Sequence, residues 1–183
     1  MTLVAGQTLT TERLVLQPFT EAHLTERYVG WLNDPEVVRF SERRHRRSDM
    51  QEARAYFASF AQSPHYYWAI VANDQALGHI GNITAHVDVP NSLAEVGILI
   101  GERAAWGRGF GTEAWRAVCS FLLGDAGLRK VSAGTLATNR GMLEVMRRCG
   151  MHDDGRRRRH YVVDGEETDI VFMALFASER RGQ

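Results

Sequence analysis

Residues 94–100 read AEVGILI, and residues 106–114 read WGRGFGTEA. The first stretch is an apolar run typical of a buried strand, and the second is a glycine-rich loop that leads into a helical pattern. Glycine has no Cβ atom, so the backbone N–H groups of such a loop can approach a ligand closely. The helix that follows directs its unpaired amides and the positive end of its dipole at the same place. Together these features predict a site for a phosphate or diphosphate group.

Gly109, Gly111 and Ala114 also satisfy the G-x-G-x-x-[GA] pattern of dinucleotide-binding proteins. A dinucleotide-binding fold needs repeated strand–helix–strand units and usually begins with the glycine loop. Here the loop lies past the middle of a 183-residue chain, and the strand patterns before it arrive as a run of three. The order of the elements therefore disfavours dinucleotide binding.

The loop from Trp106 to Gly111 resembles the [QR]-x-x-G-x-[GA] loop of the GNAT acyltransferases, with Trp106 in place of the first polar residue. Its continuation through Thr112, Glu113 and Ala114 is similar to the RimJ/RimL branch of that family. Three further segments resemble the same branch: residues 11–16 (TERLVL), residues 31–37 (WLNDPEV) and residues 139–151, the last of which corresponds to its final helix. The resemblance extends over residues 8–176, which is nearly the whole chain.

The patterns along the chain predict the order β-α-α-β-β-β-α-β-α-β-β, which is the order of the GNAT fold. The strand-like runs are 12–17, 66–72, 76–87, 93–100, 129–136, 159–163 and 169–176. The helical patterns begin at the N-cap candidates Thr20 and Ser48, span 112–123, and run from Asn139 to Gly150. We expect an α/β (α+β) GNAT acyl-CoA N-acyltransferase fold, in which four helices flank a mixed sheet of about seven strands. Residues 1–183 form one domain in this interpretation, with a short disordered tail near 178–183.

The composition indicates a soluble globular protein and gives no global argument for a nucleic-acid or membrane partner. The formal net charge is zero, and no apolar run approaches the ~18 residues that span a bilayer. The N-terminal residues lack the features of a signal peptide. Cys119 and Cys149 both lie in helical apolar patterns, so we expect buried thiols in a reducing cytoplasm. No metal site is predicted, and the sequence leaves open whether the protein is a monomer or a homodimer.

The resemblance implies that acetyl-CoA is the cosubstrate and that it lies along the strand 93–100. The backbone groups of Ile98, Leu99 and Ile100 would hold its pantetheine arm and its carbonyl. The diphosphate would lie on the loop formed by Trp106, Gly107, Arg108, Gly109, Phe110, Gly111 and Thr112. Asn139 would bind the cofactor or cap its own helix.

Glu95 is the candidate general base, because it is an acid within an apolar strand directly before the loop, and burial would raise its pKa. The resemblance also places it where many GNAT members carry a catalytic or water-holding glutamate. Strand alternation could instead point it at solvent or at an arginine. Many members have a tyrosine seven residues after the asparagine as general acid, but that position is Met146 here. The general acid is therefore unassigned, with water, Tyr161 or no dedicated group as the alternatives.

The expected reaction is the transfer of an acetyl group to a primary amine, by direct attack in a ternary complex. Neither cysteine has an evident histidine partner, so a covalent route is disfavoured. Two basic clusters, residues 43–47 (RRHRR) and 156–160 (RRRRH), either form solvated faces or flank the acceptor groove. The acceptor is a protein N-terminus or a small-molecule amine, and an anionic acceptor such as a nucleotide-linked amino sugar is the alternative. A non-catalytic CoA- or nucleotide-binding module remains open.

Overall fold

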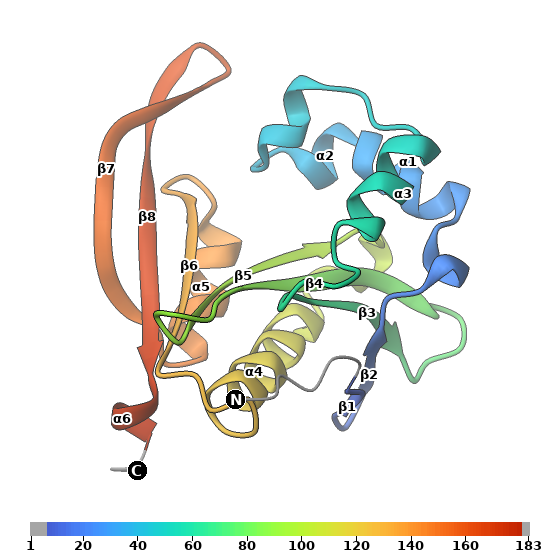
Figure 1. Ribbon diagram of the computed structural model, residues 1–183. Coiled ribbons are helices and arrows are strands. Elements are labelled where there is room, and N and C mark those ends of the chain that lie inside the picture. The colour runs from blue at the N-terminus through green and yellow to red at the C-terminus, as the bar shows by residue number, and fades with distance from the viewer. Residues whose placement is uncertain (1–6, 181–183) are drawn as a thin grey trace.

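A computed structural model describes residues 7–180 of the chain. These residues form one sheet of eight strands in the order β1-β2-β3-β4-β5-β6-β8-β7 (Figure 1). The strands are β1 (Leu9–Thr10), β2 (Leu14–Pro18), β3 (Tyr66–Ala72), β4 (His79–Asp88), β5 (Leu93–Ile100), β6 (Lys130–Leu136), β7 (His152–Val163) and β8 (Glu166–Phe176). The α-helices are α1 (Glu26–Asn33), α2 (Pro35–Val38), α3 (Met50–Ala58), α4 (Phe110–Leu123), α5 (Arg140–Arg148) and α6 (Ala177–Arg180). Three short 3-10 helices are η1 (Glu21–His23), η2 (Glu42–His45) and η3 (Arg103–Ala105).

The sheet is mixed because β5 and β6 run parallel, whereas each of the other adjacent pairs is antiparallel. A parallel pair needs a crossover connection, and α4 provides it. The end of β5 leads through η3 into α4, so the apolar strand and the glycine loop of the sequence analysis lie next to each other.

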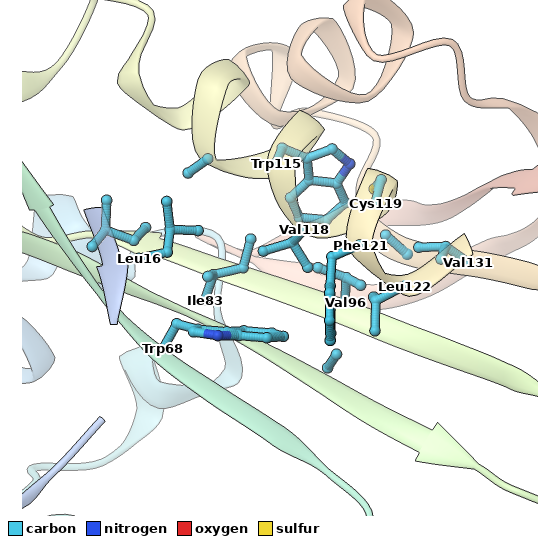
Figure 2. Packing of buried hydrophobic residues seen from close by; sticks show 14 of the residues in the cluster. Leu16, Trp68, Ile83, Val96, Trp115, Val118, Cys119, Phe121, Leu122 and Val131 are labelled. Atoms are coloured by element: carbon cyan, nitrogen blue, oxygen red, sulfur yellow. The ribbon is translucent and has the colours of Figure 1, made fainter. Parts of the chain in front are cut away.

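Helices cover both faces of this sheet (Figure 1). α4 packs on one face, where Trp115, Val118 and Leu122 are each 0% exposed (Figure 2). Their spacing of three and four residues aligns them along one side of the helix, as the sequence pattern predicts. Figure 2 shows this side of α4 above Ile83 of β4 and Val96 of β5.

A second, smaller core lies on the opposite face, under α1 and α3. The rings of Phe19 and Tyr67 stack with their centroids 4.1 Å apart. The hydroxyl groups of Tyr28 and Tyr67 form a hydrogen bond of 2.7 Å. Burial raises the pKa of both tyrosines, so they remain neutral and contribute to packing.

The predicted order of elements is confirmed, with short elements added. β5 has the predicted bounds, 93–100. The sheet has eight strands rather than about seven, because residues 9–10 form a two-residue strand against β2. Residues 7–180 contain six α-helices rather than four, but the additional α2 and α6 have four residues each.

Both predicted N-caps of the first two helices are wrong. Thr20 starts only the single turn η1, and α1 begins after Thr25, whose side chain accepts the N–H of Tyr28. α3 is capped by Asp49, whose carboxylate accepts the N–H of Glu52 at 2.8 Å. Ser48 is buried, and its backbone N–H donates to the side chain of Asn33 at 2.8 Å. That long-range contact fixes the start of α3.

Several other predicted bounds shift. β7 begins at residue 152 rather than 159 and β8 at 166 rather than 169, because the two strands pair as a long hairpin at the edge of the sheet. β4 begins at 79 rather than 76, and α4 at 110 rather than 112. In the predicted disordered tail, residues 178–180 belong to α6, and residues 181–183 lie outside the described residues.

Candidate active site

β5 and β6 pair over only part of their length. Their register runs from Leu93 opposite Lys130 to Glu95 opposite Ser132, where pairing stops. On its other side, β6 pairs with β8 along its whole length, from Lys130 to Leu136. The two parallel strands therefore diverge after Glu95, and among residues 7–180 the second half of β5 has a strand neighbour only on its β4 side.

The direction of the backbone groups in this half of β5 follows from its pairing with β4. Ile100 lies opposite Gly81, and the N–H of Gly101 donates to the carbonyl of Ile80 at 2.9 Å. This is the pattern of a non-hydrogen-bonded pair, so the peptide groups of Ile100, and two residues earlier of Ile98, point away from β4. They face the opening between β5 and β6.

The peptide groups of Leu99 point in the opposite direction to those of Ile98 and Ile100. The same alternation directs its backbone N–H and carbonyl toward Asn82 of β4. The expectation that three consecutive amides serve a ligand is therefore wrong for Leu99, because successive residues of a strand point their peptide groups in opposite directions. Ile98 and Ile100 remain the candidates.

A cavity of about 330 Å³ occupies the opening between the diverging strands. Ile98, Leu99 and Ile100 line it on the β5 side, and Thr135 and Asn139 line it on the β6 side. Further lining residues, to which the sequence analysis assigned no role in a site, are Val37, Phe40, Ser41, Val96, Gly97, Trp115, Ala133, Gly134 and Met142. The cavity is thus built from segments that are far apart in the sequence.

The glycine loop leads directly into α4 next to this opening. Gly107 has φ = 71° and Gly109 has φ = 82°, a backbone conformation that other residues adopt only with strain. Gly109 is also the N-cap of α4, and it supplies no side-chain hydrogen bond to the first turn. The first amides of the helix, at Phe110, Gly111 and Thr112, are therefore available to an anionic ligand.

Two side chains of the loop contribute in different ways. The indole N–H of Trp106 donates to the carbonyl of Ile100 at 2.8 Å and so joins the loop to the end of β5. The guanidinium of Arg108 lies over the ring of Phe110 at 5.0 Å and within 3.8 Å of Asp74. Trp106 therefore fixes the loop against the strand, in place of the polar side chain that the family pattern has there.

Asn139 is the N-cap of α5. The sequence analysis named this role as one of two alternatives, the other being a contact with the cofactor. Its side-chain oxygen accepts the N–H of Met142 at 3.2 Å, and its amide nitrogen donates to the hydroxyl of Thr135 at 3.0 Å. Because Asn139 also lines the cavity, capping and a ligand contact are compatible.

Glu95 is exposed, so of the two alternatives from the sequence the structure has the one in which strand alternation points the side chain at solvent, and the burial that would raise its pKa is absent. Its neighbours Ala94 and Val96 point into the core under α4, which directs the Glu95 side chain to the opposite face of the sheet. It lies opposite His86 of β4. Burial and the nearby His65 lower the pKa of His86, whereas the Glu95 carboxylate acts in the other direction. Glu95 therefore stands where the strands diverge, on the face that carries α1 and α3.

Position 146, where many GNAT members have a tyrosine, is a methionine here and supplies no hydroxyl group to the cavity. Met146 is 0% exposed and belongs to the core. Tyr161 lies on β7 opposite Thr168, and it is not among the residues that line the cavity. The burial of Met146 agrees with a structural role.

Comparison with known proteins identifies the family. Residues 13–152 match the family described as the acetyltransferase (GNAT) domain. This chain belongs to the GNAT acetyltransferase family. It is therefore an acyltransferase, and its sheet and helices have the GNAT fold.

Individual GNAT relatives are distant in sequence. A probable N-acetyltransferase, YjcK of Bacillus subtilis (strain 168), is 26% identical over 113 residues, which are 61% of this chain and 61% of that protein. An uncharacterized N-acetyltransferase, p20 of Bacillus licheniformis, is 24% identical over 96% of this chain and 99% of its own length. Among solved structures, RimL, a ribosomal L7/L12 alpha-N-protein acetyltransferase in complex with coenzyme A, has a TM-score of 0.79 and 13% identity, with 93% of this chain and 98% of that chain covered.

The two basic clusters of this GNAT protein have different surroundings. In the second cluster, Arg156 pairs with Asp169 at 3.1 Å and Arg159 pairs with Glu167. The first cluster, residues 43–47, lines a cavity of about 710 Å³ that includes Val163 and Asp164 at the tip of the β7–β8 hairpin. The first cluster is therefore part of a concave site.

Within residues 7–180, no group of three or more histidine, cysteine, aspartate or glutamate side chains is arranged to hold a metal ion. In the same part of the chain, none of the helices has the length and apolar character needed to cross a bilayer.

Proposed function

We propose that this GNAT protein transfers the acetyl group of acetyl-CoA to a primary amine by direct attack in a ternary complex. The observation that carries the proposal is the divergence of β5 and β6 beside the uncapped start of α4. A ligand that lies along β5 meets the free amides of Ile98 and Ile100, and its diphosphate meets the helix amides. The acceptor in this proposal is a protein N-terminus or a small-molecule amine.

The residues present fit acetyl-CoA. The positive φ angles of Gly107 and Gly109 turn the loop so that its amides can surround a diphosphate. The cavity between the strands offers apolar walls to the pantetheine arm, and Asn139 lies at its edge. When bound, acetyl-CoA supplies a thioester carbonyl, whose developing negative charge a strand amide such as that of Ile98 can stabilise.

Glu95 is the proposed general base. It is exposed at the point where the strands diverge, on the sheet face opposite α4. An amine that approaches from that face must lose a proton before or during attack, because free amines are protonated at neutral pH. Glu95 accepts this proton directly or through a water molecule.

Direct attack by the amine agrees with the state of the thiols. Cys119 is buried in the core, and burial raises the pKa of Cys149, so the thiolate form of Cys149 is disfavoured. The Cys149 thiol donates to the carbonyl of Thr112 at 3.5 Å. Neither Cys119 nor Cys149 forms a disulfide, which fits a reducing compartment, and we therefore propose a cytoplasmic location.

Cofactor binding is tested by thermal unfolding with acetyl-CoA, CoA and NADPH in parallel. A ligand at a hundred times its dissociation constant adds about 2.7 kcal/mol to the stability of the folded state. We expect a rise of several degrees with acetyl-CoA and with CoA, and none with NADPH. Stabilisation by NADPH alone would contradict the acetyltransferase proposal.

The role of Glu95 is tested with Glu95→Gln, which keeps the size of the side chain and removes its charge. Turnover, followed as CoA release with a panel of N-terminal peptides and small amines, should fall by about a hundredfold or more. The acetyl-CoA dissociation constant should stay within about twofold, because Glu95 does not line the cavity. Glu166→Gln, in an exposed glutamate on β8, is the matched control. Unchanged turnover in Glu95→Gln would remove Glu95 from the mechanism.

A further inference from the structure

The first basic cluster forms a cavity that the transfer of an acetyl group does not by itself explain. Arg39, Arg43, Arg44, Arg46 and Arg47 line it, and Asp164 is the one acidic residue in the lining. We call this site the arginine cavity. Five arginines against one aspartate give its lining a net charge of +4 with His45 counted as neutral, although the chain as a whole is neutral.

Two of these arginines build the wall of the cavity. Arg44 has a side chain only 13% exposed, and it donates to Glu42 at 2.7 Å and to the carbonyl of Ser41 at 3.0 Å. It also reaches the carbonyl of Val162 at 3.4 Å, which joins η2 to the hairpin tip. Arg43 donates to the hydroxyl of Ser48 at 3.3 Å and lies 5.2 Å above the ring of Tyr56. Their charges are thus held in place.

The other three arginines have exposed side chains without an acidic partner. Arg39, Arg46 and Arg47 take part in none of the ion pairs formed within residues 7–180. Like charges that converge on a concave surface raise the potential there and concentrate anions. The contrast with Arg156 and Arg159, which pair with acids on β8, shows that this chain neutralises arginines elsewhere.

The arginine cavity adjoins the cavity between the diverging strands β5 and β6, where we propose that acetyl transfer occurs. Val38, Arg39 and Arg43 line the first, whereas Val37, Phe40 and Ser41 line the second. The segment 37–43 therefore forms a wall shared by both. A ligand held in the arginine cavity lies beside the place where the proposed amine attack occurs.

We infer that the arginine cavity binds a phosphate group of the acceptor, and that the acceptor is a phosphorylated small-molecule amine. This inference rests on the proposed function, because it takes the amine of the bound ligand to be the group that receives the acetyl group. A phosphate carries up to two negative charges and accepts bidentate hydrogen bonds from several guanidinium groups at once. A volume of about 710 Å³ lies in the range of small-molecule sites.

The experiment is a calorimetric titration of CoA-saturated protein with inorganic pyrophosphate. Saturating CoA occupies the glycine loop, so any further anion site is observed separately. We expect one pyrophosphate per chain in the wild type and at least tenfold weaker binding in Arg46→Gln/Arg47→Gln. Both arginines are exposed, and equal melting temperatures of variant and wild type establish that the variant is folded. Arg54→Gln, in an exposed arginine on α3, should bind within twofold of the wild type.

Two results would overturn the inference. One is the absence of pyrophosphate binding to the CoA-saturated wild type, and the other is equal binding by Arg46→Gln/Arg47→Gln. A glutamate-rich N-terminal peptide that binds the wild type where pyrophosphate does not would assign the cavity to carboxylates instead. Titration of the same preparations with acetyl-CoA distinguishes the two failures. Absence of acetyl-CoA binding by the wild type would contradict the proposed function, whereas normal acetyl-CoA binding without pyrophosphate binding would contradict only this inference.

Discussion

Arg13 and Glu113 lie one hundred residues apart in the chain and meet beside the glycine loop. The backbone N–H of Arg13 donates to Glu113 at 2.9 Å and its Nε donates at 2.7 Å, while Thr11 donates its hydroxyl at 2.6 Å. Arg13 also donates to the carbonyl of Arg108 at 2.9 Å and lies 4.7 Å above the ring of Phe110. The turn before β2 is therefore joined to the loop and to the first turn of α4.

The titration of Glu113 agrees with this arrangement. Burial alone would raise its pKa, but hydrogen bonds from Thr11 and Arg13 and the charge of Arg13 outweigh burial and hold the pKa below its usual value. Glu113 is therefore ionised at neutral pH and keeps Arg13 against the loop.

Loss of this contact should weaken cofactor binding. In Glu113→Ala, Arg13 and Thr11 lose their shared acceptor, and we expect a cost of about 1–3 kcal/mol in the free energy of unfolding. The loop loses its support, so the acetyl-CoA dissociation constant should rise about tenfold. Calorimetry and urea unfolding measure the two effects. Glu144→Ala, which removes the exposed pair with Arg148 on α5, is the control. Equal affinities in the two variants would mean that the contact does not support the loop.

A methyl group at Gly109 should affect the loop in two ways. Its φ of 82° makes alanine strained by about 1–2 kcal/mol, and a Cβ atom would stand 3.4 Å from the guanidinium of Arg13. Gly127→Ala is the matched control, because its φ is 66° and its Cβ would meet nothing within 4 Å. Both variants should lose similar stability, whereas only Gly109→Ala should lose acetyl-CoA affinity. A similar loss of affinity in both would point to general destabilisation.

Substitutions of Asn139 separate its cap from its proposed ligand contact. Asp is as good an N-cap as Asn, so Asn139→Asp should keep the melting temperature, whereas Asn139→Ala should cost about 1 kcal/mol. The new carboxylate in Asn139→Asp stands at the edge of the cavity and should weaken acetyl-CoA binding several-fold. Affinity equal to that of the wild type in Asn139→Asp would leave Asn139 as a cap alone.

His79 should make the fold sensitive to acid. Burial first, then the nearby His23, lowers its pKa from 6.5 to about 4, and its ring bonds to the carbonyl of Gly81 at 2.9 Å. Since the unfolded chain binds the proton more readily, stability is fully present above pH 6.5 and falls as the pH drops toward 4. This loss amounts to at most about 3 kcal/mol.

The test is urea unfolding of His79→Gln and the wild type at intervals from pH 7 to pH 4. Glutamine does not titrate, so the stability of the variant should fall less steeply over this window. His160→Gln, in an exposed histidine on β7, should follow the wild type. Parallel curves for His79→Gln and the wild type would refute the assignment.

The local patterns of the sequence predict the central part of the fold well. β5 has the predicted bounds because a continuous apolar run lies between turn residues, and α4 presents the predicted side to the core. β7 is largely missed, because an exposed edge strand rich in arginine has no apolar periodicity to read. Its identity as a strand depends on hydrogen bonds to β8.

Part of the candidate site can likewise be predicted from local sequence patterns, and part cannot. The glycine loop at 107–111 and its position before a helix are visible in the sequence, because positive φ angles select glycine directly. The direction of the Leu99 peptide groups depends on the register between β4 and β5, which the sequence pattern does not contain. The sequence left two alternatives open for Glu95, and the structure has the exposed one.

The sequence by itself determined most of the elements and the glycine loop, since propensity, periodicity and glycine conformation act over a few residues. Only the tertiary structure decided that β5 and β6 diverge after Glu95, that Arg13 meets Glu113, and that one of two similar arginine clusters lines a cavity. These relationships join residues far apart in the chain. They arise from strand register and packing, which local sequence does not encode.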